Sequence, residues 1–93
     1  MQDEQAVLEA AELLIEAVAL SEALLDGDLT EARFRAGQLV EKPAVATNPD
    51  LRSSAGRVVS LLGPPGSHPL PGYADAVVDL TDRLEQVATF LRG

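Results

Sequence analysis

The segment DEQAVLEAAELLIEAVALSEALL, residues 3–25, decides the fold because it is the longest stretch able to form one uninterrupted helix. One stripe of its helical wheel is apolar throughout: Val7, Leu8, Ala11, Leu14, Ile15, Val18 and Leu25. Further leucines extend this stripe around the side: Leu13, Leu20 and Leu24. The polar part is a narrow acidic ridge: Glu9, Glu12 and Glu16. A helix that is apolar over so much of its circumference needs several partners, so we expect it to be the central helix.

Glycine, proline and capping residues divide the remaining chain into further helices. Gly27 ends the first helix, and Asp28 caps the second, which Pro43 terminates. Asn48 followed by Pro49 is a strong start signal for the third helix, after a short loop over residues 44–47. A low-complexity loop with four prolines, residues 63–72, precedes the last helix, in which Pro71 occupies the first turn. The expected helices are therefore 3–25, 28–41, 48–62 and 71–92.

These elements predict an all-α fold, a small antiparallel four-helix bundle with two long helices and two shorter ones between them. With 93 residues the chain is expected to form a single domain, residues 1–93, with one small core. It contains no cysteine, so its stability must come from packing without disulfides. Small domains of this kind often gain stability by self-association.

The net charge of −8 is unevenly placed, because every charged residue before Arg33 is acidic. Such a chain repels phosphate groups, which argues against nucleic acid and against an anionic membrane as partners. The acidic N-terminus lacks the pattern of a secretory signal, so we expect a cytoplasmic protein. Frequent Ala, Leu, Val, Arg and Pro beside a single Lys, Ile and Asn is typical of a GC-rich bacterial coding sequence.

The sequence offers no arrangement of residues suited to catalysis or metal binding. His68 is the only histidine and lies between Ser67 and Pro69 in the proline-rich loop, and no serine of the chain has a histidine partner in a plausible helical arrangement. The ridge glutamates lack the histidine partners of di-iron bundles. We therefore expect a protein that is not an enzyme and carries no cofactor or metal, although a small apolar ligand in the bundle interior remains an open alternative.

Phe34 is expected to point away from the seam between the first two helices, flanked by Arg33 and Arg35. It either packs against another part of its own chain or anchors a contact with a second chain, where aromatic and arginine side chains are enriched.

Two functional hypotheses follow. The first is a protein-interaction module that acts as a homodimer through apolar helix faces, with these candidate interface residues: Phe34, Arg33, Arg35, Leu13, Leu20 and Leu24. The second is an acidic inhibitor or antitoxin-like protein that caps a basic partner with the surface of Glu9, Glu12 and Glu16.

Overall fold

A computed structural model describes residues 4–92, which contain five helices and no strand. They are α1 (Glu4–Leu25), α2 (Leu29–Glu41), α3 (Pro43–Ala46), α4 (Pro49–Leu62) and α5 (Tyr73–Arg92). The prediction of an all-helical chain is confirmed. None of the helices within these residues combines the length and apolarity that crossing a membrane requires.

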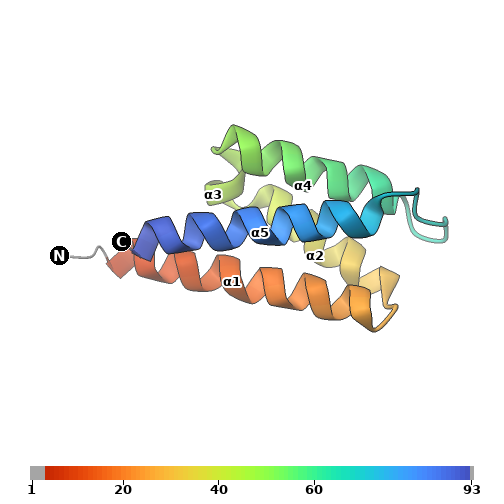
Figure 1. The fold of residues 1–93 in the computed structure, drawn as a ribbon, viewed down its shortest axis with the longest axis horizontal. Helices are drawn as coiled ribbons and strands as arrows, with labels where there is room; N and C mark the ends of the chain where they lie inside the picture. The colour runs from red at the N-terminus through yellow and green to blue at the C-terminus, as the bar shows by residue number, and fades with distance from the viewer. Residues whose placement is uncertain (1–3, 93) are drawn as a thin grey trace.

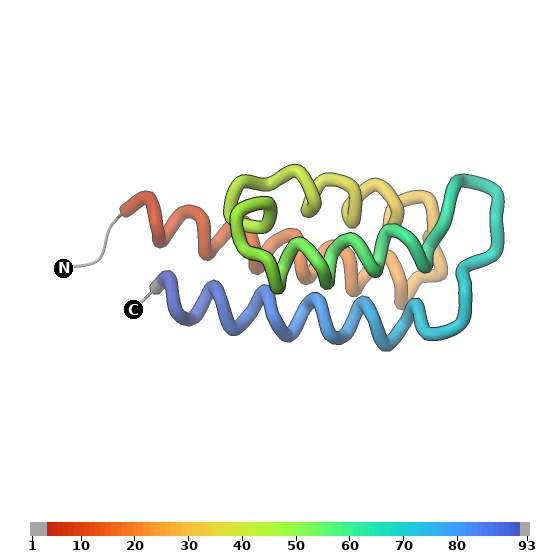
Figure 2. Tube along the Cα trace, turned by 90° about the horizontal axis from the view of Figure 1, so that it is seen from above, coloured from red at the N-terminus to blue at the C-terminus, as the bar shows by residue number. Residues whose placement is uncertain are grey.

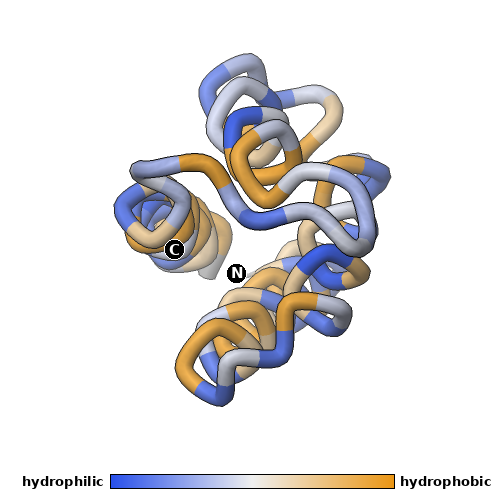
Figure 3. Tube along the Cα trace, turned by 90° about the vertical axis from the view of Figure 1, so that its right-hand side faces the viewer, coloured by the Kyte–Doolittle hydropathy of each residue, from blue (hydrophilic) through white to orange (hydrophobic). Residues whose placement is uncertain are grey.

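The two longest helices, α1 and α5, lie side by side along the molecule and form its most extensive helix–helix contact (Figure 1). α4 packs on α5 and on α2, α2 packs on α1, and the short α3 joins α2 to α4. The start of α1 and the end of α5 lie at one end of the molecule, and the loop between α4 and α5 lies at the other (Figure 2). The molecule is elongated, with extents of 47 × 25 × 19 Å. Figure 3 looks along this long axis and shows the helices grouped around a shared interior.

The core is built from leucines separated by small residues. Its α1 contribution alternates leucine with alanine: Ala10, Leu13, Ala17, Leu20 and Ala23. The other helices add the remaining large buried side chains: Leu39, Val45, Leu51, Val58, Leu62, Val77, Leu80 and Leu84. Alanine at the contact positions lets neighbouring helix backbones approach closely.

Most helix ends form as the sequence predicts. Gly27 has φ +71°, and the amides of Gly27 and Asp28 donate to the carbonyls of Leu24 and Ala23, the pattern of a Schellman motif. Asp28 accepts a 3.0 Å hydrogen bond from the Glu31 amide and so caps α2. Asn48 caps α4 through the amides of Asp50 and Leu51.

Two expected boundaries change. The expected loop over residues 44–47 is mostly the short helix α3, which Pro43 begins and whose end Thr47 closes by donating a side-chain hydrogen bond to the Pro43 carbonyl. The last helix begins at Tyr73, because Gly72 has φ +93°, which is outside the helical region. The expected start of the first helix at Asp3 lies outside the described residues.

Candidate functional site

An exposed apolar face runs along α1 on the side away from the other helices. It consists of Leu8, Ala11, Ile15, Val18 and Leu25, all exposed, and is called the outer face below. Ile15 is 63% exposed and Leu25 is 84% exposed. A row of large apolar side chains on one helix is the kind of surface that in soluble proteins marks contact with another macromolecule.

The residues of the outer face all belong to the apolar stripe predicted for residues 3–25. The leucines that extend this stripe around the side of the helix lie in or against the core instead. Leu13 and Leu20, two of the candidate interface residues, are 1% and 0% exposed, and Leu24 packs against the core. These three leucines are therefore not available to a second chain in this structure. The reason is that α5 and α2 pack against the side of α1 on which buried leucines alternate with alanines.

The acidic ridge of α1 faces basic residues of α2 and its C-terminal cap. Glu16 accepts a 3.1 Å hydrogen bond from Arg35, and its side chain is 12% exposed. Glu12 lies 3.8 Å from the ammonium group of Lys42. Of the three candidate residues for an acidic surface, these two are thus engaged within the chain, and Glu9 is half-buried beside them. The contacts of Glu12 and Glu16 with these cations help to set the orientation of α1 relative to α2.

Phe34 is 57% exposed and points away from the seam between α1 and α2, as expected from the sequence. Its ring lies 6.0 Å from the Arg35 guanidinium, at the outer limit of a cation–π contact. With Val59 and Pro65 it lines a shallow apolar hollow between α2, α4 and the proline-rich loop. Arg35 itself donates to Glu31 and Glu16, and the Glu31 hydrogen bond is the main reason why its pKa is raised.

Arg33 holds the proline-rich loop against α2. Its guanidinium donates to the carbonyls of Leu62, Gly63 and Ser67, at 3.1, 3.1 and 2.7 Å. These oxygens include carbonyls at the C-terminal end of α4, where a cation is favoured by the helix dipole. Arg33 is therefore occupied within its own chain, which leaves Phe34 as the exposed member of the Arg33, Phe34 and Arg35 group.

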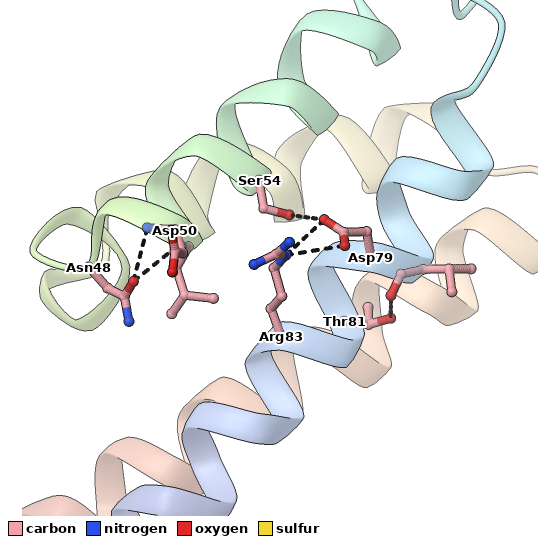
Figure 4. Close-up of polar contacts among 8 residues, drawn as sticks. Asn48, Asp50, Ser54, Asp79, Thr81 and Arg83 are labelled. Carbon is pink, nitrogen blue, oxygen red and sulfur yellow. Dashed lines mark hydrogen bonds and ion pairs between the residues drawn. The ribbon is translucent and has the colours of Figure 1, made fainter.

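A polar cluster that the sequence analysis missed lies between α4 and α5 (Figure 4). Ser54, which is almost fully buried, donates a 2.9 Å hydrogen bond to Asp79, and Arg83 donates to the same carboxylate at 3.0 and 3.1 Å. The pKa of Asp79 is lowered, first by the Ser54 hydrogen bond and then by that of Arg83. Asp50 and Arg57 line the same open hollow. The sequence could have indicated the pair of Asp79 and Arg83, because opposite charges four residues apart on one helix lie close together.

In the described residues, the side chains that could act as an acid, a base or a metal ligand are spread over the molecule. His68 is exposed in the proline-rich loop. Within residues 4–92 no group of three or more His, Cys, Asp or Glu side chains is placed to hold a metal ion. The carboxylate of Asp79 accepts hydrogen bonds from Ser54 and Arg83, which tie α5 to α4 and favour the ionised carboxylate.

Comparison of the chain with protein-family models, with curated proteins and with solved structures finds no match in any of the three. The functional argument therefore rests on the surface of the molecule itself.

Proposed function

We propose that the chain is a non-catalytic, cytoplasmic protein-interaction module, built as an antiparallel four-helix bundle, that acts as a homodimer through the outer face of α1. The observation that carries the proposal is the exposure of Leu8, Ile15, Val18 and Leu25 along one side of the longest helix. Burying a side chain of this size contributes on the order of 1.5–3 kcal/mol relative to leaving it exposed. Several such side chains on each of two chains supply a large driving force for association.

Charge on α1 is compatible with this role. Glu12 and Glu16 face Lys42 and Arg35 of the same chain, so their charges are partly neutralised away from the outer face. Glu22 is the acid that lies within the row formed by the outer face, between Val18 and Leu25. The apolar part from Leu8 to Val18 thus lies free of charged residues along its centre line.

The alternative of an acidic protein that caps a basic partner has less support. It needs the carboxylates of the ridge to be free, whereas two of the three are held by cations of the chain. Contacts between exposed charges are also weakened by salt, since the Debye length falls from about 10 Å at 0.1 M to about 3 Å at 1 M. The two proposals therefore predict opposite responses to ionic strength.

The test is light scattering coupled to size exclusion, at low and high salt and at high micromolar concentration. The expected result is a dimer that persists at high salt, because apolar burial holds it together and salt screens the repulsion between two chains of charge −8. Ile15→Arg should convert the dimer to a monomer. Gln86→Arg, which adds the same charge at an exposed position of α5, is the control and should remain dimeric. A wild-type protein that is strictly monomeric would contradict the proposal.

A further inference from the structure

The outer face has the residue spacing of a coiled-coil seam. Its residues and Glu22 follow one another in alternating steps of three and four: Leu8, Ala11, Ile15, Val18, Glu22 and Leu25. This is the a and d pattern that brings one helix into register with another helix of the same repeat. The pattern extends over almost the full length of α1, whose 22 residues span roughly 33 Å at 1.5 Å per residue. The surface is therefore suited to a long helix.

We propose that the helix occupying this face is α1 of a second copy, lying antiparallel to the first. This inference rests on the proposed homodimer and adds its orientation and register. In an antiparallel seam an a position of one helix meets a d position of the other. Leu8 then lies opposite Leu25 of the second copy, Ile15 lies opposite Val18, and Glu22 lies opposite Ala11.

Glu22 decides the orientation. A parallel seam would place it directly opposite Glu22 of the second copy, two like charges between apolar layers, and the described part of α1 has no basic residue to neutralise them. In the antiparallel register each Glu22 meets the small side chain of Ala11, which leaves room for the carboxylate to reach water. The two Glu22 carboxylates are then separated by eleven residues along the seam, about 16 Å. That distance exceeds the Debye length of about 8 Å at physiological ionic strength.

The flanks of the seam fit the same orientation. Glu12 and Ala19 occupy equivalent flanking positions of successive repeats, and the antiparallel register places each Glu12 beside Ala19 of the second copy. Glu12 lies 3.8 Å from the ammonium group of Lys42 in its own chain, which partly neutralises its charge. Between Leu8 and Leu25 the seam positions of each copy thus carry one charged residue, Glu22, and the two Glu22 side chains lie far apart.

Disulfide trapping tests this arrangement directly, because the chain contains no cysteine of its own. Leu8→Cys and Leu25→Cys each change an exposed position, so neither variant disturbs the core. Oxidation of an equimolar mixture of the two variants should give a covalent dimer linked between positions 8 and 25, identified by peptide mass spectrometry. Each variant oxidised alone should stay unlinked, since its two cysteines would lie at opposite ends of the seam. Gln86→Cys on α5 reports the background of random collision.

The outcomes separate the orientation from the homodimer itself. A wild-type dimer in light scattering, with Leu8→Cys and Leu25→Cys each linking only to itself, would overturn the antiparallel arrangement and leave the homodimer intact. A wild-type dimer with no linkage above the Gln86→Cys background would place the interface elsewhere and overturn this inference. A wild-type monomer would overturn both proposals.

Discussion

Leu13 and Ile15, two residues apart on α1, lie on opposite sides of the helix: Leu13 is 1% exposed in the core, and Ile15 is 63% exposed on the outer face. They are aliphatic side chains of similar size, so the same truncation at both positions separates the energetics of the core from those of the surface.

Leu13→Ala should lower the free energy of unfolding by about 2–5 kcal/mol, because it removes buried methyl groups and leaves a cavity. Ile15→Ala should lower it by less than about 1 kcal/mol in dilute solution, since its side chain is largely exposed in the single chain. Urea denaturation monitored by circular dichroism at low micromolar concentration gives both values. Equal losses at the two positions would contradict the assignment of the core face.

The stability contributed by the bond between Ser54 and Asp79 should depend on pH. The pKa of Asp79 is lowered in the folded chain, chiefly by the Ser54 hydrogen bond, so the fold favours the ionised carboxylate. This stabilisation is present above the unfolded pKa, about 3.9, and is lost as the pH falls through the lower pKa of the folded state. Ser54→Ala should raise the pKa of Asp79 toward its ordinary value.

Thermal unfolding of wild type and Ser54→Ala from pH 7 to pH 2 checks this expectation. The difference in stability should be present at neutral pH and should shrink at the acid end. Ser53→Ala, at the exposed neighbouring serine, is the matched control and should leave the pKa of Asp79 unchanged. A difference that is constant over the whole range would show that Asp79 is not the group concerned.

Removing Arg33 should destabilise the fold by about 2 kcal/mol, because hydrogen bonds that involve a charged group are worth roughly 1.5–3 kcal/mol. Arg33→Lys should recover only part of this, since an ammonium group lacks the planar fork that reaches Leu62, Gly63 and Ser67 together. Arg52→Ala, at an exposed position of α4, is the control. If Arg33→Ala and Arg52→Ala unfolded at the same urea concentration, the loop contact would contribute nothing.

Two glycines should respond to alanine in opposite directions. Gly63 has φ +71° and ψ −175°, a region that is essentially restricted to glycine, and an added Cβ would lie 2.8 Å from the Ser67 hydroxyl oxygen. Gly63→Ala should therefore lower the free energy of unfolding by about 1–3 kcal/mol. Gly37 lies inside α2 with open space around it, so Gly37→Ala should stabilise the chain by about 0.5–1 kcal/mol. Denaturant midpoints of both variants test the pair.

The helices were largely predictable because their ends are set by local chemistry: Asp28 and Asn48 cap with their own side chains, and Gly27 takes a positive φ. The short α3 was missed because a single turn after Pro43 has too few residues to show periodicity. Which side of α1 is buried could not be predicted, since both sides are apolar. The choice depends on where alanines allow α2 and α5 to approach, a property of tertiary packing.

The candidate site was predictable only in part. The exposed position of Phe34 follows from helical geometry, whereas the partner of Glu16 requires knowing that Arg35 lies beside it across the seam. The bond from Ser54 to Asp79 joins residues far apart in sequence, so the sequence pattern alone gave no indication of it. The stripe of α1 was recognised correctly as apolar, and only the structure shows that its main residues face outward.

The contact of Arg33 with the proline-rich loop also has a consequence for how the molecule opens. The loop joins α4 to α5, and its first residues are held by a side chain of α2, while the Leu70 amide donates back to the Leu61 carbonyl. Separating α2 from the other helices therefore releases the segment that links the last two. Amide protons of α2 and of the C-terminal turn of α4 should exchange with solvent through the same opening event, as one cooperative unit.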